Sequence, residues 1–342
     1  MQKLMVTGGA GFIGSNFARM ILEKYPDYHV LVYDKLTYAG NSDNLRDLND
    51  NPRYTFVRGD IADAAKVDET VETYGVDAIV NFAAESHVDR SIEEPGGFIQ
   101  TDVYGVYVLL EATRRFKLER FLQVSTDEVY GAVLSGSSVE TDLLQPRSPY
   151  SASKAGGELQ AQAYYVTYNT PTLVTRGSNT YGPYQYPEKM LPLFITNALE
   201  DKPVPMYGDG MYVRDWMHVL DHCSGIDLVL HKGELGGIYN VGGGNEHPNI
   251  EVTYSILDRL GKPRSLIHYV QDRPGHDRRY SVDTTKIRAL GWEPQVSFEQ
   301  GLADTVDWYK NNEEWWERIK SGEFASYYAK MYDQREILAK HE

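Results

Sequence analysis

The chain has 342 residues, of which 42% are hydrophobic, so it is long enough to bury a core and to form one large domain or two closely joined ones. Its formal net charge of −15 repels polyanions, which argues against nucleic acids and anionic membranes as partners. The only cysteine, Cys223, excludes an intrachain disulfide and a cysteine-rich metal cage, and it fits a reducing cytosol.

Short apolar runs alternate with longer helical patterns through the first half of the chain. This alternation predicts a doubly wound α/β fold, in which crossover helices cover both faces of a parallel sheet. The expected strands span residues 4–6, 29–33, 54–57, 77–82, 120–124 and 172–175. After about Gly177 the chain breaks into pieces rich in proline and glycine, which predicts a smaller mixed α/β substrate-binding lobe. We therefore expect a first domain over 1–176, joined by a returning strand near 237–242, and a substrate lobe over most of 177–342.

Three glycines, Gly8, Gly11 and Gly14, follow the first expected strand directly and open the first expected helix. Such a loop lets the backbone turn tightly and approach a pyrophosphate, which then faces the helix N-terminus. Asp34 ends the next strand about 20 residues further on, in place for a ribose hydroxyl. Because a carboxylate repels an extra phosphate, we predict a Rossmann-type domain that binds NAD, although the neighbouring Lys35 weakens this preference.

Two further segments, Asp60-Ile61 and Phe82 to Ser86, follow the third and fourth expected strands. Parallel strands end at one edge of the sheet, where folds of this kind bind ligands. We expect both segments to contact the cofactor, with an ordinary strand-ending loop as the alternative for each.

Tyr150 and Lys154 are four residues apart, on one face of a helix that Ser148 and Pro149 are expected to begin. A nearby cation lowers the pKa of a phenol from about 10, which lets it act as a base near neutrality. Among 26 tyrosines, about one such pair arises by chance, so the neighbouring motif Ser125-Thr126 decides the interpretation. We predict a catalytic pair rather than a surface pair.

Two adjacent carboxyl groups, Asp127 and Glu128, follow directly. The pKa values of abutting carboxyl groups are pushed apart, which suits one general acid and one general base. The alternative is a solvated turn or a helix N-terminus. Together with Tyr150, the pair predicts an enzyme that oxidises, dehydrates and reduces a sugar.

With these motifs the chain resembles the extended short-chain dehydrogenase/reductase superfamily, whose members pair such a glycine loop with a Tyr-x-x-x-Lys helix. Within it, the chain is similar to the dTDP-glucose 4,6-dehydratase family. The segments that carry the resemblance extend over nearly the whole sequence and comprise residues 34–41, 83–89, 125–131, 181–185 and 272–277.

The resemblance implies dehydration of dTDP-glucose to dTDP-4-keto-6-deoxyglucose, with a tightly bound NAD that is regenerated in each turnover. Tyr150 would remove the proton of the 4-hydroxyl while hydride leaves carbon 4, and Thr126 would hydrogen-bond the 4-oxygen. Glu128 would take the proton of carbon 5 and Asp127 would protonate the departing 6-hydroxyl. The hydride would then return to carbon 6, with Lys154 as the fifth catalytic residue.

The resemblance also implies the remaining site residues. The expected cofactor-binding residues are Gly8, Gly11, Phe12, Ile13, Gly14, Asp34, Lys35, Leu36, Thr37, Asp60, Ile61, Phe82, Ala83, Ala84, Ser86, Thr101, Tyr150, Lys154 and Thr180. The expected substrate-binding residues are Ser86, Thr126, Asn179, Lys189, Met190, Leu191, Pro192, Leu193, Phe194, Pro205, Met206, Tyr207, Arg214, Asn249, Asp272, Arg273, Pro274, Gly275 and His276. Arg214 and Arg273 can neutralise a diphosphate, with a surface ion pair as the alternative for each. No ligand spacing surrounds His276, so we expect it to hydrogen-bond and predict no metal.

Two positions depart from the family's pattern. The family usually has Thr-Asn-Val where this chain has Thr101-Asp102-Val103, and Asn-Asn where it has Asn179-Thr180. An ionised Asp102 cannot donate a hydrogen bond and Thr180 is shorter than asparagine, so we expect rearranged hydrogen bonds near the cofactor and the sugar. These changes bear on substrate choice and rate more than on the type of reaction.

Two other functions compete with dehydration. A nucleotide-sugar 4-epimerase or decarboxylase shares the glycine loop, Tyr150 and Lys154 but does not require an acid/base pair at positions 127 and 128. An NAD-binding sensor without catalysis needs neither the Tyr150/Lys154 pair nor converging arginines. The sequence leaves the nucleotide base open, because only one methyl group distinguishes thymine from uracil.

The helical patterns over residues 97–115 and 150–168 carry more apolar side chains than one sheet face consumes. The family generally pairs through such helices, so we expect a homodimer held by a four-helix bundle, with internal packing as the alternative. We expect neither a signal peptide nor a membrane-spanning stretch, and therefore a cytoplasmic protein.

Overall fold

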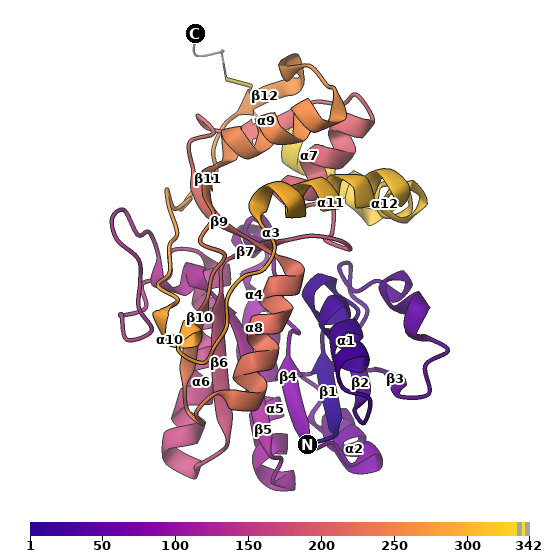
Figure 1. The fold of residues 1–342 in the computed structure, drawn as a ribbon, viewed down its shortest axis with the longest axis vertical. Coiled ribbons are helices and arrows are strands. Elements are labelled where there is room, and N and C mark those ends of the chain that lie inside the picture. Colours follow the sequence, from indigo (N-terminus) through magenta and orange to yellow (C-terminus); the bar gives the residue numbers. More distant parts are fainter. Residues whose placement is uncertain (334–336, 339–342) are drawn as a thin grey trace.

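A parallel sheet of seven strands forms the first lobe, in the order β10-β6-β5-β4-β1-β2-β3 (Figure 1). The computed structural model describes residues 1–333 and 337–338. The strands of this sheet are β1 Lys3–Thr7, β2 His29–Asp34, β3 Tyr54–Arg58, β4 Ala78–Asn81, β5 Arg120–Thr126, β6 Thr172–Gly177 and β10 Ile238–Val241. The six strands expected in the first half and the Rossmann-type order are thereby confirmed.

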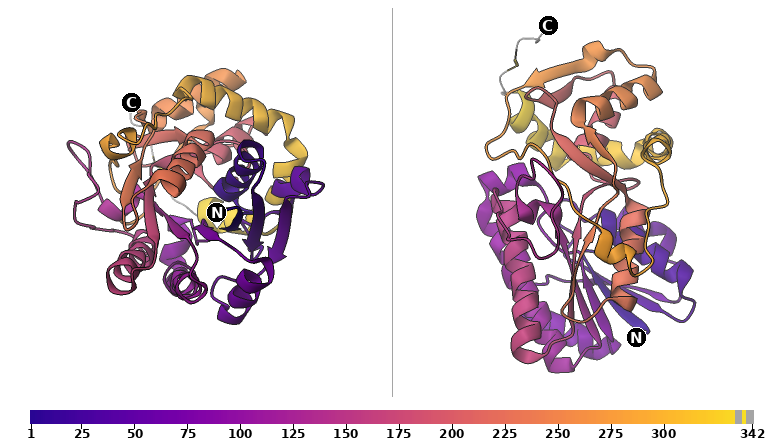
Figure 2. Two further views of the ribbon diagram at one scale, coloured as in Figure 1. Left: turned by 60° about the horizontal axis from the view of Figure 1, so that its bottom comes forward. Right: turned by 60° about the vertical axis from the view of Figure 1, so that its left-hand side comes forward.

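Helices cover both faces of this sheet, which is why its strands read as nearly continuous apolar runs (Figure 2). Phe17 and Ile226 belong to the core of one face, and Val67 and Leu109 belong to the core of the other. The helices of the first face are α1 Phe12–Lys24 and α8 Val219–Lys232. The helices of the second face are α2 Ala64–Tyr74, α5 Val106–Phe116 and α6 Pro149–Tyr168. Although α8 and β10 come after Gly177 in the sequence, both pack on the first lobe.

The second lobe has a core of its own, which includes Leu193, Ile256, Val306 and Trp316. Its elements are α7 Met190–Leu199, β8 Val204–Tyr207, α9 Asn249–Leu260, η4 Arg264–Leu266, β12 Ile267–Val270, α11 Phe298–Asn311, α12 Glu313–Ser321, α13 Glu323–Tyr328 and η5 Ala329–Asp333. A three-stranded sheet connects the two lobes and consists of β7 Asn179–Tyr181, β9 Val213–His218 and β11 Glu246–Pro248. Within the described part of the chain, no helix is long and apolar enough to cross a membrane.

Helix α6 begins where the sequence predicts, because Ser148 and Ser151 form a reciprocal capping box and Pro149 occupies the first turn. A short π-helix, η2 Ile99–Gly105, lies against α6 and continues into α5. The approach is close, since a Cβ atom on Gly157 would overlap the carbonyl oxygen of Asp102. The remaining short elements are η1 Ser42–Leu48, α3 Val88–Glu93, α4 Pro95–Phe98, η3 Asp127–Tyr130 and α10 Thr285–Arg288.

Candidate active site

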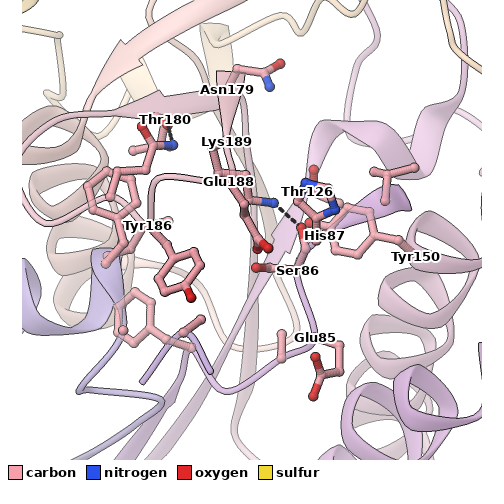
Figure 3. A pocket seen from close by; sticks show the side chains of 18 of the residues that line it. Glu85, Ser86, His87, Thr126, Tyr150, Asn179, Thr180, Tyr186, Glu188 and Lys189 are labelled. Carbon is pink, nitrogen blue, oxygen red and sulfur yellow. Dashed lines mark hydrogen bonds between the residues drawn. The ribbon is translucent and has the colours of Figure 1, made fainter. Parts of the chain in front are cut away.

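A cavity of about 430 Å³ lies at the carboxyl ends of the parallel strands, where the second lobe faces the sheet (Figure 3). Residues that follow β1, β2, β4, β5 and β6 line it from the first lobe. Arg214, Asn249 and Arg273 line it from the second half of the chain. In Figure 3, Tyr150 and Thr126 lie on one side of the cavity, and Thr180 and Tyr186 lie on the other.

The glycine loop leaves no room for side chains. Gly8 has a φ of +64°, and a Cβ on it would lie 2.5 Å from the amide nitrogen of Ala83. A Cβ on Gly14 would lie 2.5 Å from the carbonyl oxygen of Gly8. The backbone is therefore open to a ligand at the N-terminus of α1, as a pyrophosphate requires.

Asp34 lies at the carboxyl end of β2 and lines the same end of the cavity. Its carboxylate accepts hydrogen bonds from the amides of Ala10 at 2.9 Å and Leu36 at 2.7 Å, which fix the side chain beside the glycine loop. The ammonium group of Lys35 forms an ion pair with Asp60 at 2.6 Å. Lys35 is thereby partly neutralised, so the carboxylate that disfavours a 2′-phosphate dominates and the residues fit NAD.

Tyr150 and Lys154 lie one turn apart on α6, at the end of the cavity where β5 terminates. Lys154 is only 5% exposed and donates a hydrogen bond to the carbonyl oxygen of Val124 at 2.8 Å. The net shift in the pKa of Tyr150 is opposite to the lowering that the sequence predicts. Burial, followed by the charges of Glu128 and Asp102, raises the pKa of Tyr150 well above its ordinary value.

Asp127 and Glu128 lie in η3, directly after β5. Asp127 is 3% exposed, and its Oδ2 atom has no hydrogen-bond partner within residues 1–333 or 337–338. Burial, together with the neighbouring charges of Glu128 and Asp215, raises the pKa of Asp127 well above its ordinary value. Glu128 is more exposed and accepts a hydrogen bond from the hydroxyl of Tyr280 at 3.4 Å. A buried carboxyl group with a raised pKa thus lies beside a second, more exposed one, which is the arrangement expected of a general acid and a general base.

Cationic side chains from the second half of the chain face these carboxyl groups. Arg214 is buried, donates hydrogen bonds to the carbonyl oxygens of Val213 and Asp277, and lies over the ring of Tyr280. Arg273 forms an ion pair with Asp89 at 3.1 Å. The surface ion pair considered as the alternative is therefore wrong for both arginines, since each lines the cavity.

Lys189 also lines the cavity, and its ammonium group donates to the carbonyl oxygen of Ser86 (Figure 3). His276 lines the same cavity. Burial lowers the pKa of His276 to about 4, so the ring is neutral and serves as a hydrogen-bonding group. In the part of the chain that the structure describes, no cluster of three or more His, Cys, Asp or Glu side chains could hold a metal ion.

The cavity brings together all but five of the residues that the sequence assigns to the site. The five that do not line it are Leu36, Pro192, Asp272, Pro274 and Gly275. Three of them have a place behind the wall: the amide of Leu36 donates to Asp34, Pro192 is buried within α7, and Asp272 lies 2.7 Å from the ring nitrogen Nδ1 of His276. Pro274 and Gly275 are exposed.

Both residues that depart from the family pattern form hydrogen bonds within the protein. Asp102 accepts from the hydroxyl of Ser153 at 2.6 Å and from the amide of Glu85 at 2.9 Å. Thr180 donates to the carbonyl oxygen of Ser178 at 3.1 Å and lies 2.8 Å from Nδ1 of His222. Neither side chain is free to turn toward a ligand without losing a bond.

Several cavity residues escape the sequence prediction. They include His87, Asp89, Ser125, Ser178, Gln185, Tyr186, Glu188, Trp216, His222 and Tyr332. Glu188 directly precedes Lys189, which the sequence assigns to the site, so its position next to Lys189 could have indicated that it also lines the cavity. Asp89 is recognisable only through its bonds to Arg273 and Tyr207, which lie more than a hundred residues away in the sequence.

The fold and the site define an enzyme of the nucleotide-sugar class within the extended short-chain dehydrogenases/reductases. A family model described as GDP-mannose 4,6 dehydratase matches residues 5–305. A dTDP-glucose 4,6-dehydratase from Streptomyces niveus is 50% identical over 330 residues, covering 95% of this chain and 98% of the relative. The chain belongs to the dTDP-glucose 4,6-dehydratase family.

Solved structures agree with this assignment. DesIV, a dTDP-glucose 4,6-dehydratase from Streptomyces venezuelae solved with NAD bound, is 53% identical with a TM-score of 0.91, covering 93% of this chain and 100% of that one. A UDP-glucose 4-epimerase from Thermotoga maritima has a TM-score of 0.85 at 30% identity, covering 91% of this chain and 100% of that one. Because the epimerase shares the fold, the fold alone does not distinguish dehydration from epimerisation, and the residues of the site must do so.

Proposed function

We propose that the protein is an NAD-dependent hydro-lyase that converts dTDP-glucose to dTDP-4-keto-6-deoxyglucose. The observation that carries the proposal is the carboxyl group of Asp127, which is buried in the same cavity as Tyr150 and Lys154 and whose pKa is raised well above its ordinary value. An epimerase needs the tyrosine and the lysine but no acid for a departing hydroxyl. Relatives about 50% identical over most of the chain carry the name of this dehydratase.

The glycine loop and Asp34 would hold NAD, which would supply the oxidising step by taking up hydride from carbon 4 and returning it to carbon 6, and whose positive charge would favour the phenolate of Tyr150. Tyr150 removes the proton of the 4-hydroxyl, and Thr126 donates a hydrogen bond to the 4-oxygen. The resulting ketone makes the proton on carbon 5 acidic.

Elimination then uses the two carboxyl groups of η3. Glu128 takes the proton of carbon 5 while Asp127 gives its proton to the 6-hydroxyl, which leaves as water. Glu128 returns its proton to carbon 5 when carbon 6 receives the hydride. A proton then moves through solvent from Tyr150 to Asp127, so both residues regain their starting state.

The nucleotide end of the substrate lies against the second lobe in this proposal. Arg214, Arg273 and Lys189 place three positive charges on that side, and planar guanidinium groups suit the oxygens of a diphosphate. These charges hold an anionic ligand in a chain whose net charge of −15 would otherwise repel it.

We also propose that the protein is a cytoplasmic homodimer. Leu159 and Val166 on α6 are 51% and 82% exposed, and Tyr104 and Tyr107 expose apolar rings on the neighbouring η2 and α5. A second copy of α5 and α6 would cover this surface as a four-helix bundle. Light scattering should report a dimer for the wild-type protein and a monomer for a Leu159→Glu variant. A monomeric wild-type protein would contradict the dimer, and a dimeric variant would contradict this interface.

The activity is tested by incubating the purified protein with NAD and, separately, dTDP-, UDP-, CDP- and GDP-glucose, followed by mass spectrometry. We expect dTDP-glucose to lose one water. A product of unchanged mass that is an isomer would identify an epimerase instead, and loss of water from another nucleotide sugar alone would correct the base.

A further inference from the structure

Asp102 is held in one geometry at the contact between η2 and α6. Its side chain is 2% exposed, and each carboxyl oxygen has a partner. Oδ2 accepts from the hydroxyl of Ser153 at 2.6 Å, and Oδ1 accepts from the amide of Glu85 at 2.9 Å. Because Ser153 lies between Tyr150 and Lys154 on α6, Asp102 is tied to the helix that carries both.

The hydroxyl of Ser153 has one proton and two acceptors in reach. It lies 2.6 Å from Oδ2 of Asp102 and 2.8 Å from the carbonyl oxygen of Tyr150. An ionised Asp102 accepts a hydrogen bond from the hydroxyl of Ser153. A neutral Asp102 instead donates a hydrogen bond to that hydroxyl, which then donates to the carbonyl oxygen of Tyr150. An asparagine at this position reproduces only the neutral arrangement, because its amide is a permanent donor.

The charge of Asp102 acts on both members of the catalytic pair. Tyr150 also faces Glu128 and Asp127 from η3, and Lys154 also faces Glu158 from its own helix. Burial is the largest influence on the pKa of each, but a negative Asp102 raises the pKa of Tyr150 and that of Lys154 alike.

Asp102 itself faces Lys154 and Glu85. Burial raises its pKa to about 6, so the side chain is charged at neutral and higher pH and neutral in acid. The two hydrogen-bond arrangements of Ser153 are therefore both within reach of ordinary conditions.

We propose that Asp102 is a positioning residue whose charge moves the working pH range of the Tyr150–Lys154 pair upward. The inference rests on the proposed function, in which Tyr150 is the base. A negative charge makes Tyr150 hold its proton to higher pH, and it makes Lys154 keep its ammonium form to higher pH. Both limbs of the activity profile therefore lie further toward alkaline pH than they would with an amide at position 102.

The test is the pH profile of kcat/KM for dehydration of dTDP-glucose by the NAD-loaded Asp102→Asn variant. Asparagine keeps the acceptor for the amide of Glu85 and a partner for Ser153 while it removes the charge. We expect both limbs to move toward lower pH by about one pH unit, the size of effect that one nearby charge produces. A merely structural role would lower activity without moving the limbs.

Two further variants keep the test decisive. Ser153→Ala removes the donor that favours the charged form of Asp102, so we expect a smaller shift in the same direction, even if Asp102→Asn fails to fold. Asp227→Asn is the matched control, because Asp227 is a buried aspartate on α8 that does not line the cavity, and its profile should not move.

The outcomes separate the two proposals. An Asp102→Asn variant that removes water from dTDP-glucose with an unmoved or alkaline-shifted profile overturns the inference and leaves the proposed function intact. A wild-type protein that removes no water from dTDP-glucose overturns both.

Discussion

The first lobe meets the cavity with glycines and strand ends, whereas the second lobe meets it with long cationic side chains. Gly8 and Gly14 let the backbone itself form the wall near Asp34. Arg214 and Arg273 form the opposite wall with guanidinium groups. A backbone wall suits a ligand that stays in place, while charged side chains suit an anion that is exchanged in every cycle.

The catalytic groups belong to the more rigid of these walls. Thr126 ends a strand that is paired on both edges, and Tyr150 lies in the first turn of a capped helix. Arg214 lies on β9 in the sheet that connects the two lobes, and Arg273 lies on a loop after β12. We therefore expect substitutions in the first lobe to lower kcat and substitutions in the second lobe to raise KM.

The largest expected effect tests the catalytic wall. Tyr150→Phe removes the base for the 4-hydroxyl, so kcat should fall about a thousandfold while nucleotide-sugar binding persists. Stopped-flow absorbance of NADH and calorimetry with dTDP-glucose measure the two quantities. Tyr164→Phe, on the same helix but bonded to Glu111 outside the cavity, is the control and should keep its activity.

Asp127→Asn should separate oxidation from elimination. An amide cannot protonate the leaving hydroxyl, so dehydration should fall about a hundredfold while NADH still forms and accumulates. Because the pKa of Asp127 is raised, its carboxyl group is protonated at low pH and loses the proton as the pH rises. The rate of elimination by the wild-type protein should therefore decline on the alkaline side. Equal loss of NADH formation and dehydration in the variant would argue against this division of roles.

Arg273→Gln tests the cationic wall. Loss of a charged hydrogen-bond donor to a phosphate costs about 2 kcal/mol, so KM for dTDP-glucose should rise about thirtyfold with little change in kcat. Initial-rate measurements distinguish the two constants. The exposed pair of Arg278 with Asp209 provides the comparison, because Arg278→Gln should leave KM within about twofold.

The smallest effect concerns the backbone wall. In Gly14→Ala the new methyl group meets the carbonyl oxygen of Gly8, so we expect about tenfold weaker NAD binding in a calorimetric titration. Gly97→Ala places the same methyl group on α4 with no atom within 4 Å and should bind NAD normally. Identical affinities for NAD in the two variants would mean that the glycine loop shifts to accommodate the methyl group at little cost in binding free energy.

The sequence predicts most of this site because its regular parts have local signals. Apolar runs between glycines identify the strands, and Pro149 with Ser148 identifies the start of α6. Long-range pairs have no such signal: Asp89 and Arg273 are 184 positions apart, and Asp102 and Ser153 are 51 apart. The predicted lowering of the pKa of Tyr150 differs from the structure for the same reason, because burial and the carboxylates that face Tyr150 depend on the folded arrangement.

Strand β10 has a consequence for how the chain is made. It pairs with β6 at the edge of the large sheet, yet it is synthesised only after β8 and β9 of the second half. While the polypeptide leaves the ribosome, β6 therefore presents an unpaired edge until residue 241 has emerged. A chain terminated near residue 177 should aggregate rather than yield a stable nucleotide-binding fragment, and the two lobes should unfold in a single cooperative transition.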